Sequence, residues 1–391
     1  MGLKFLRIDD PEPLNLDKVR FLPGKNKFLL SSSQDPGNEF YCDFCFEKNP
    51  SYSHLRDSQF DVYLFHNSAF AANDIYQISD SKSRTEANRG RLGYLIPIQS
   101  LINAEHDYGD NEHFSPYAYH AIRILLSDKN ALPYKRLGIP NSVFIDLEAI
   151  YGENTHVLIL HKPYVTIWEK VHAIKFEIKY FLPCLWSYGY MSIEESNFNV
   201  LYKDKEHGNG AEKPINGIIE FTSIAPDLRT DPFILNLFTS FLYSQKHELI
   251  RFHLLYQVIE LLIEKVFQSE LGSIIQDFDN NVNNFYDIKE KLTIVANEKS
   301  RITKLFSNYC IGQNALLEAL KISCNKLLKQ VNPEYEQSSP QIAVYKTRSL
   351  VFHSFRSLPT EYDENLKVIN DDFEALIIAT INSFKYPENS N

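Results

Sequence analysis

The pattern of apolar residues changes once along this chain, near residue 231, and no other feature constrains the fold as strongly. Before that point the apolar runs are short, rich in β-branched and aromatic residues, and separated by turn residues, as in strands. After it, apolar residues recur at spacings of three and four, as in amphipathic helices. Asp231 followed by Pro232 is a favourable helix start, with an aspartate N-cap and a proline at the first helical position. We therefore predict an α+β chain, with a β-rich domain over residues 1–225 and an all-α helical bundle over residues 231–391.

Short apolar runs in the first part are predicted as strands, and the stretch 117–126 as one helix. The segment 171–180 alternates between two sets of residues, and this period of two predicts a further strand with one buried face. The other predicted strands cover 60–65, 92–98, 142–147, 156–161 and 217–222.

The second part is predicted as an antiparallel bundle of about five helices joined by short links. Asn, Gly and Pro residues separate the helical patterns, and Pro340 and Pro359 bracket the fourth of them. The helical stretches cover 233–267, 287–309, 313–331, 342–356 and 370–384.

The composition excludes several classes of protein. Hydrophobic residues make up 44% of the 391 residues, so disorder is excluded as the main state, and 27 Phe and 23 Tyr can bury a large core. The net charge is −10, with 20 acidic against 16 basic residues from 231 onward, so neither part is a general coat for nucleic acid. We find no apolar run near the ~20 residues of a membrane span, no signal-peptide pattern and no disulfide framework among five scattered cysteines. We expect a cytoplasmic protein with reduced thiols and no membrane partner.

The segment 345–356 carries the pattern with the clearest chemistry. It holds Arg348 and His353, separated by four residues, on a predicted helix late in the bundle. Histidine can take or give a proton near neutral pH, and arginine offers a planar fork of donors that fits phosphate oxygens. A pair of this kind can deprotonate a ribose hydroxyl and stabilise charge on a phosphate.

The spacing also makes a geometric prediction. At about 100° per residue, a separation of five places the two side chains roughly 140° apart around an ideal helix. Arg348 and His353 should therefore not point the same way from one straight helix. This favours a groove at a subunit interface, or a local distortion of the helix near His353.

This arrangement resembles the Arg-x4–6-His signature of HEPN-superfamily ribonucleases, and most of all their ApeA-like phage-defence branch. The early helix, in which Arg251 precedes an apolar and aromatic stretch and Glu260, is similar to the long early helix of that superfamily. The resemblance covers residues 231–385 and not the first part. The residue after the arginine is Ser349, where family members often carry Asn, Asp or His.

The resemblance implies an RNA endonuclease that needs no metal, leaves a cyclic phosphate end, and forms its site between two protomers of a homodimer. Arg348 and His353 would be catalytic and Ser349 supporting, while Glu260 would orient Arg348 or tune His353. Lys346, Arg356 and Arg251 are expected to hold RNA phosphates. Such an enzyme would act in abortive infection against phage, or as a toxin, on RNA, with tRNA as one candidate. The β-rich domain would then sense a phage-derived trigger or a regulatory ligand.

Two other interpretations stay open. The alternative to a nuclease is a non-catalytic recognition and dimerisation protein in a defence or regulatory complex. Cys42 and Cys45 form a Cys-x2-Cys pair, but a zinc site commonly uses two such pairs and a second pair is missing. Their aromatic surroundings favour buried structural cysteines over a zinc-dependent nucleic-acid binder. The sequence holds no Gly-rich phosphate loop, so no nucleotide or other cofactor is expected.

Overall fold

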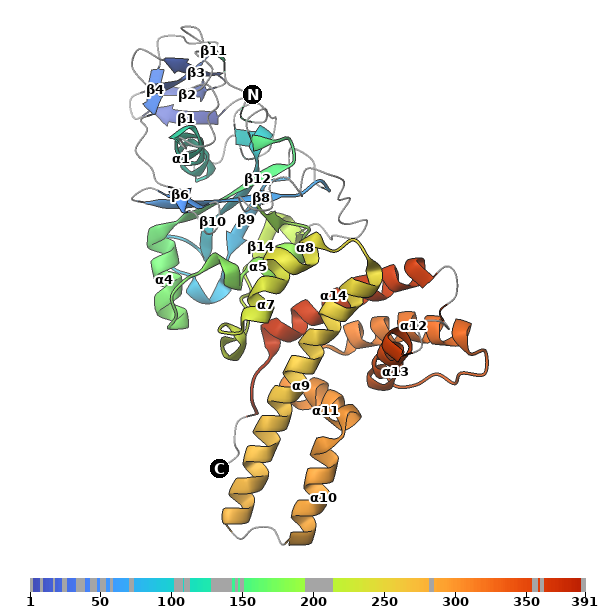
Figure 1. The fold of residues 1–391 in the computed structure, drawn as a ribbon. Helices are drawn as coiled ribbons and strands as arrows, with labels where there is room; N and C mark the ends of the chain where they lie inside the picture. The colour runs from blue at the N-terminus through green and yellow to red at the C-terminus, as the bar shows by residue number, and fades with distance from the viewer. Residues whose placement is uncertain are drawn as a thin grey trace. The chain divides into compact units, whose positions relative to one another are not determined.

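The computed structural model divides the chain into two compact units, Met1–Thr222 and Ser223–Asn391. The first unit is β-rich and the second helical, which confirms the predicted α+β class (Figure 1). The structure describes residues 3–7, 10–16, 18–22, 27–32, 39–42, 48–49, 54–56, 59–69, 74–101, 108, 113–127, 143–144, 147, 151–193, 214–280, 285–353, 358 and 362–387.

An eight-stranded sheet forms the core of the first unit, in the order β14-β9-β10-β12-β8-β7-β6, with β13 also paired to β8. All of its pairs are antiparallel except β14 with β9. Its two central strands are apolar along most of their length, as expected of strands covered on both faces. The strands are β6 (Lys48–Asn49), β7 (His54–Arg56), β8 (Phe60–His66), β9 (Tyr76–Ser79), β10 (Arg91–Pro97), β12 (Thr155–His161), β13 (Met191–Ser192) and β14 (Ile218–Glu220).

Glycine at position 93 lets the central strands approach each other. A Cβ atom there would lie 1.9 Å from the carbonyl oxygen of Ile159 on β12, a distance that no side chain could tolerate. Two helices, α1 (Phe114–Ser127) and α4 (Lys162–His172), both contact β10 and β12.

Two smaller sheets complete the first unit. One consists of β1 and β2, and the other has the order β11-β3-β4-β5. Their strands are β1 (Leu3–Arg7), β2 (Asp10–Leu16), β3 (Lys18–Leu22), β4 (Lys27–Ser31), β5 (Glu39–Cys42) and β11 (Val143–Phe144).

Most predicted strands of the first unit are confirmed, and the prediction for 171–180 is wrong. The runs 60–65, 92–98, 156–161 and 217–222 become β8, β10, β12 and β14, while 142–147 contributes the two residues of β11. The segment 171–180 instead finishes α4 at His172, turns at Ala173 with φ 51°, and forms a short 3-10 helix at Ile178–Tyr180. A proline in the first turn favours the start of α4, because its fixed φ suits that position. The end of this helix and the turn after it happen to place apolar residues at every second position, which is the pattern expected of a strand.

Asp231 caps the first α-helix of the second unit, as predicted. Its carboxylate accepts hydrogen bonds from the backbone N–H groups of Phe233 and Ile234, at 3.0 and 3.2 Å. The long pattern 233–267 is broken before His247, which caps the next helix through the N–H of Leu249. The helices are α7 (Pro232–Asn236), α8 (Leu242–Ser244), α9 (Glu248–Asp279), α10 (Phe285–Ala296), α11 (Glu298–Lys304), α12 (Asn314–Val331), α13 (Pro340–His353) and α14 (Tyr362–Ser383), with π-helical turns at Leu237–Phe241 and Leu305–Tyr309.

Helices α9, α12, α13 and α14 form the bundle that carries the candidate site. α14 contacts both α9 and α12, and α13 contacts α12 and α11. Phe252 and Tyr256 of α9 are fully buried against Phe373 of α14. Aromatic side chains thus form the contact between the longest helix and the last one.

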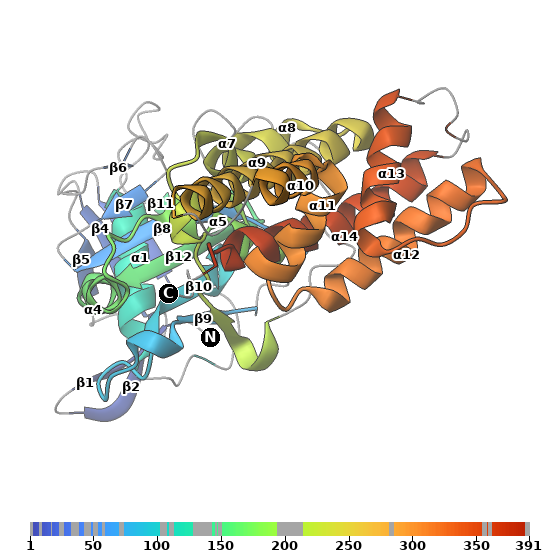
Figure 2. The ribbon, with the colours of Figure 1, turned by 90° about the horizontal axis from the view of Figure 1, so that it is seen from below.

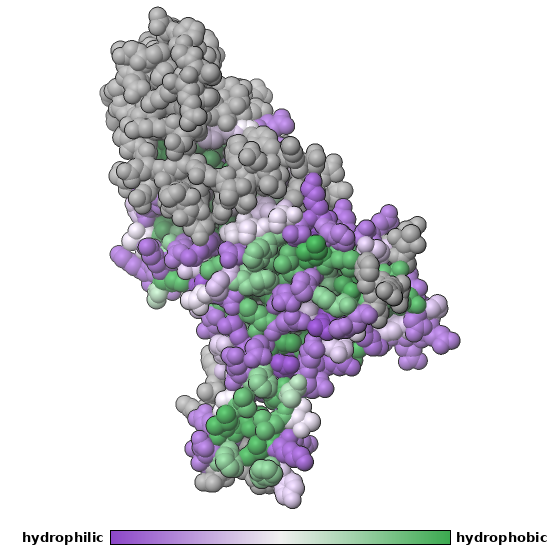
Figure 3. Space-filling model, viewed as in Figure 1, coloured by the Kyte–Doolittle hydropathy of each residue, from purple (hydrophilic) through white to green (hydrophobic). Residues whose placement is uncertain are grey.

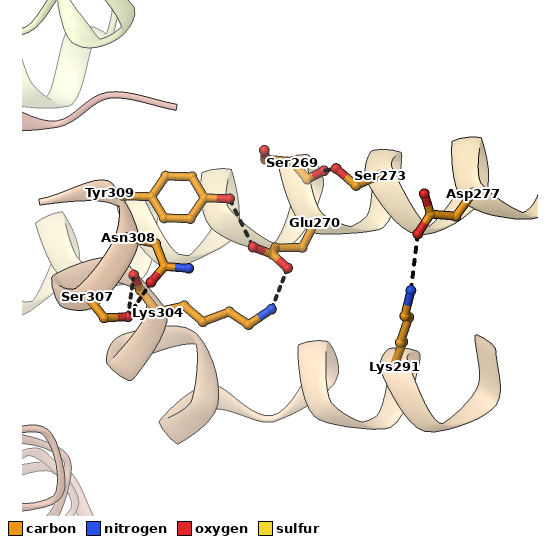
Figure 4. A network of polar contacts seen from close by, with 9 residues as sticks. All are labelled: Ser269, Glu270, Ser273, Asp277, Lys291, Lys304, Ser307, Asn308 and Tyr309. Carbon is orange, nitrogen blue, oxygen red and sulfur yellow. Dashed lines mark hydrogen bonds and ion pairs between the residues drawn. The ribbon is translucent and has the colours of Figure 1, made fainter. Parts of the chain in front are cut away.

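The second half of α9 lies beside α10 and forms a two-helix arm (Figures 1 and 2). Glu270 of α9 accepts hydrogen bonds from Lys304 and from the Tyr309 hydroxyl, and Asp277 pairs with Lys291 at 3.1 Å (Figure 4). Apolar side chains are exposed over the same arm (Figure 3); they are Ile275, Phe278, Phe285, Tyr286, Leu292 and Ile294. Within the described part of the chain, no helix has both the length and the apolar character needed to cross a membrane.

Candidate active site

Arg348 and His353 meet at the end of α13, within a single protomer. The Nη1 group of Arg348 donates to Nε2 of His353 at 3.2 Å. The prediction that the two side chains point apart is therefore wrong. The rotation of about 100° per residue fixes where the two Cα atoms lie, but the long arginine side chain can reach around the helix to the histidine ring. His353 is also the last residue of α13.

Glu260 of α9 holds the other side of the guanidinium. Nη2 of Arg348 donates to Oε1 of Glu260 at 3.1 Å, and Gln257 donates to the second oxygen of the same carboxylate at 2.7 Å. The side chains of Arg348 and Glu260 are 25% and 34% exposed, so water screens the pair and it contributes little to stability, of order 1 kcal/mol or less. Its effect is to fix the position of the guanidinium.

Two aromatic rings support the same guanidinium. It lies 5.6 Å from the ring centre of Tyr256 and 5.3 Å from that of Phe352, within the range of cation–π attraction. The Tyr256 hydroxyl donates to Glu298 of α11 at 2.9 Å. Burial, together with the nearby Glu298 carboxylate, raises the pKa of Tyr256 far above its ordinary value, so it stays a neutral phenol.

The contact between Arg348 and His353 specifies a protonation state. Arginine is always a donor, so Nε2 of His353 must accept, which requires a neutral imidazole with its proton on Nδ1. A doubly protonated ring could not accept this bond and would repel the guanidinium. While this hydrogen bond is made, Nε2 of His353 is its acceptor and faces Arg348.

The structure brings Arg348, His353 and Glu260 together, and places the other predicted residues differently. Ser349 is half-buried next to Arg348 on α13, and Lys346 is exposed on the same helix with its ammonium 4.5 Å from the Tyr335 ring centre. Arg356 lies outside the described residues.

Arg251 belongs to a different group at the start of α9. It is buried and pairs with Glu374 of α14 at 2.6 Å, with Glu248 3.9 Å away. In the described part of the chain it has no hydrogen bond or ion pair with Arg348 or His353. Its position is that of a residue joining α9 to α14.

The sequence analysis missed His253 and Phe352 and treated Tyr256 as a core residue only. His253 is exposed on α9, and its ring centre lies 4.9 Å from that of Phe352. His253, Tyr256 and Glu260 are spaced by three and four, so they share one helix face, and that spacing could have revealed them.

The thiols offer no second catalytic centre among the described residues. Cys184, Cys310 and Cys324 are free and buried, and burial raises the pKa of Cys310 and of Cys324 to about 12, so both stay protonated. No group of three or more candidate metal ligands occurs in that part of the chain. The predicted alternative of a zinc site at Cys42 and Cys45 stays a prediction, because Cys45 lies outside the described residues.

The candidate site thus combines the Arg348 guanidinium, the His353 imidazole and two aromatic rings beside the guanidinium. A search with this chain finds no matching protein-family model, no matching curated protein and no matching solved structure.

Proposed function

We propose that this protein is an RNA endonuclease that needs no metal, with Arg348 and His353 as its catalytic pair. The observation that carries the proposal is their 3.2 Å contact at the end of α13, supported by Glu260 of α9. A permanently charged donor and a ring that can exchange a proton lie within hydrogen-bond distance of each other, so one phosphate that contacts the first lies next to the second.

The chemistry follows from these two groups. The ribose 2′-hydroxyl of RNA attacks the adjacent phosphorus, which requires removal of its proton and stabilisation of the charge that builds on the phosphate oxygens. His353 exchanges the proton, and Arg348 supplies the positive charge in the transition state. The product carries a 2′,3′-cyclic phosphate.

Binding of the substrate changes the resting contacts. In the resting site Nε2 of His353 accepts from Arg348, so it cannot yet accept from a hydroxyl. A phosphate that takes the Nη1 donor releases this nitrogen for proton transfer. Glu260 keeps hold of Nη2 and so maintains the orientation of the fork. The base is therefore freed only when substrate is present.

The resemblance to HEPN-superfamily ribonucleases supports a role in defence against phage or as a toxin, and a homodimeric assembly. The net charge of −10 supports a selective enzyme over a constitutive RNA binder. Its N-terminal unit would receive the trigger.

The test is cleavage of tRNA and of total RNA by the purified full chain with EDTA present. We expect His353→Ala to lower the rate by ~10²-fold or more, and Arg348→Lys, which keeps the charge but loses the fork, to lower it as well. Lys329→Met, at an exposed position of α12 with no predicted role in the site, is the matched control and should cleave within a few-fold of wild type. The proposal fails if wild type cleaves nothing under any activating condition, or if His353→Ala cleaves as fast as wild type.

A second function has one observation in its favour. The arm formed by α9 and α10 exposes several large apolar side chains, which marks a protein contact. A recognition and dimerisation protein without catalysis would use this surface and leave RNA intact. Induced expression distinguishes the two, because only the enzyme makes growth arrest and RNA loss depend on His353.

A further inference from the structure

Cleavage of RNA through its 2′-hydroxyl moves two protons, and the pair described above accounts for one of them. One group removes the proton of the attacking hydroxyl, and another protonates the departing 5′-oxygen, which leaves poorly as an alkoxide. The attacking and leaving oxygens lie on opposite sides of the phosphorus, so one side chain cannot easily reach both. If the proposed function holds, a second proton-transfer group is needed, which is either the second copy of His353 in a homodimer or another residue beside Arg348.

His253 is placed to be that group. Its ring lies 4.9 Å from the Phe352 ring, and the Arg348 guanidinium lies 5.3 Å from the same ring. His253 and Arg348 are therefore no farther apart than these two distances combined. Phe352 directly precedes His353 in α13, so one exposed aromatic ring links both histidines to the arginine.

The environment of His253 leaves its nitrogens available. It is exposed, and among the described residues its ring nitrogens have no hydrogen bond or ion pair. Its contact with the protein is the tilted packing on Phe352, with an interplanar angle of 59°. An exposed ring that packs on Phe352 and has no polar partner among the described residues can give a proton to a bound substrate.

We infer that His253 is the general acid of the reaction and His353 its general base. His353 takes the proton from the 2′-hydroxyl as the bond from the 2′-oxygen to phosphorus forms. The bond from phosphorus to the 5′-oxygen breaks, and that oxygen takes a proton from His253. One proton is removed and one supplied, so the step balances without a further reactant, and exchange with water restores both rings. This inference rests on the proposed nuclease function.

The division of roles follows from the contacts in the resting site. Nε2 of His353 accepts from Arg348 in the resting contact, so this nitrogen can take a proton once a phosphate replaces it as the partner of the guanidinium. The ring nitrogens of His253 have no hydrogen bond or ion pair among the described residues, so they are available to a leaving oxygen. These contacts fit His353 as the base and His253 as the acid.

The experiment varies the leaving group. A short synthetic RNA with a mapped cleavage position is made in two versions, one ordinary and one with sulfur in place of the 5′-bridging oxygen at that position. The sulfur leaves as a thiolate and needs no proton. Cleavage by the full-length protein is compared for His253→Phe, His253→Ala, His353→Ala and Ile250→Ala. Phenylalanine keeps a ring against Phe352, and Ile250 is an exposed neighbour on α9 that serves as control.

We expect both His253 variants to cleave ordinary RNA ~10²–10⁴-fold more slowly than wild type, and the sulfur-containing RNA within a few-fold of wild type. His353→Ala should be slow on both substrates, and Ile250→Ala should match wild type.

Three results would overturn the assignment. The first is a His253→Phe variant that cleaves ordinary RNA at the wild-type rate, which would show that only ring packing matters. The second is an equal loss of rate on both substrates in this variant, which excludes protonation of the leaving group. The third is rescue of His353→Ala by the sulfur substrate, which reverses the roles. In each of these cases wild type still cleaves through His353, whereas failure of the proposed function shows as a wild type that cuts neither substrate.

Discussion

The two units of this protein hold buried arginine in opposite ways. In the sheet unit, Arg91 at the start of β10 is only 9% exposed, and it forms no ion pair with any described residue. Its guanidinium lies 5.9 Å from the ring centre of Tyr94 and 6.0 Å from that of Tyr117. The guanidinium of Arg91 is thus surrounded by aromatic rings and their hydroxyl groups.

Three arginines of the helical unit pair with glutamates from neighbouring helices. Arg251 is as buried as Arg91, yet its Nη2 group lies 2.6 Å from Glu374. The other pairs are Arg301 with Glu264 at 3.8 Å and Arg348 with Glu260 at 3.1 Å.

The difference reflects what each architecture places next to a charge. Adjacent helices present polar residues along the edges of their contacts, so a carboxylate is within reach. The core of a sheet covered on both faces offers aromatic rings, whose electron-rich faces partly replace the lost water. A charge in the helical unit therefore depends on one partner, whereas Arg91 depends on several weak contacts. Removing charge should cost the two units different amounts.

The largest effect is expected for Arg251→Met, which removes the ion pair between Arg251 and Glu374. We expect the free energy of unfolding to fall by about 3 kcal/mol, because both side chains are largely enclosed and removing one partner of such a pair is strongly destabilising. Urea unfolding followed by far-UV circular dichroism measures it. Arg301→Met, whose pair is longer and whose Glu264 is exposed, is the control and should cost less than half as much. Equal losses would show that burial of the pair does not set the effect.

A smaller effect is expected from pH on the sheet unit. His156 on β12 is buried, its Nδ1–H donates to the Asn154 carbonyl, and burial lowers its pKa to about 4. The unfolded chain takes up this proton near the ordinary pKa of about 6.5, so stability falls as pH drops from 6.5 to 4, by roughly 3 kcal/mol in all. Nearby His66, whose pKa burial also lowers, acts in the same direction, and Asp74 opposes it.

Tryptophan fluorescence measures this effect on the sheet unit alone, because both tryptophans, Trp168 and Trp186, lie in it. The difference between the unfolding midpoints at pH 7 and at pH 4.5 should be smaller for His156→Gln than for wild type. A His156→Gln protein with the full wild-type pH dependence would show that other groups cause it.

The smallest effect is expected for Arg91→Met. Methionine removes the cost of burying an unpaired charge and keeps much of the apolar volume, while two cation–π contacts are lost. These terms oppose each other, so we expect a change within about 1 kcal/mol of wild type in either direction. Thermal unfolding followed by tryptophan fluorescence reports it. A loss as large as that of Arg251→Met would mean that Arg91 has a strong partner, and the comparison of the two units would fail.

The fold could be predicted where one pattern dominates. Continuous apolar runs gave the central strands β10 and β12, and the Asp231 cap gave the start of the helical unit. The segment 171–180 misled because alternation alone does not distinguish a strand from a helix end followed by a turn. The break before His247 was missed because apolar spacing continues across it.

The candidate site could be predicted only in part, because local patterns do not show which side chains meet in space. Spacing identified Arg348 and His353, but their contact depends on side-chain length, which helical projection does not include. His253 was missed because its exposure and its packing on Phe352 depend on how α9 meets α13. Arg251 looked like an RNA contact, and its burial against Glu374 depends on α14, more than a hundred residues later.

The parallel pairing of β14 with β9 sets an order of events during synthesis. Ile219 of β14 pairs with Ile78 of β9, about 140 residues earlier, and β14 is the last strand before the helical unit. The edge of β9 therefore stays open on the ribosome until Glu220 has been made, and pairing over such a separation is slow. During that interval an unpaired strand edge is a template for other chains. Translation speed through the segment before β14 would thus govern how much of this protein reaches its native state.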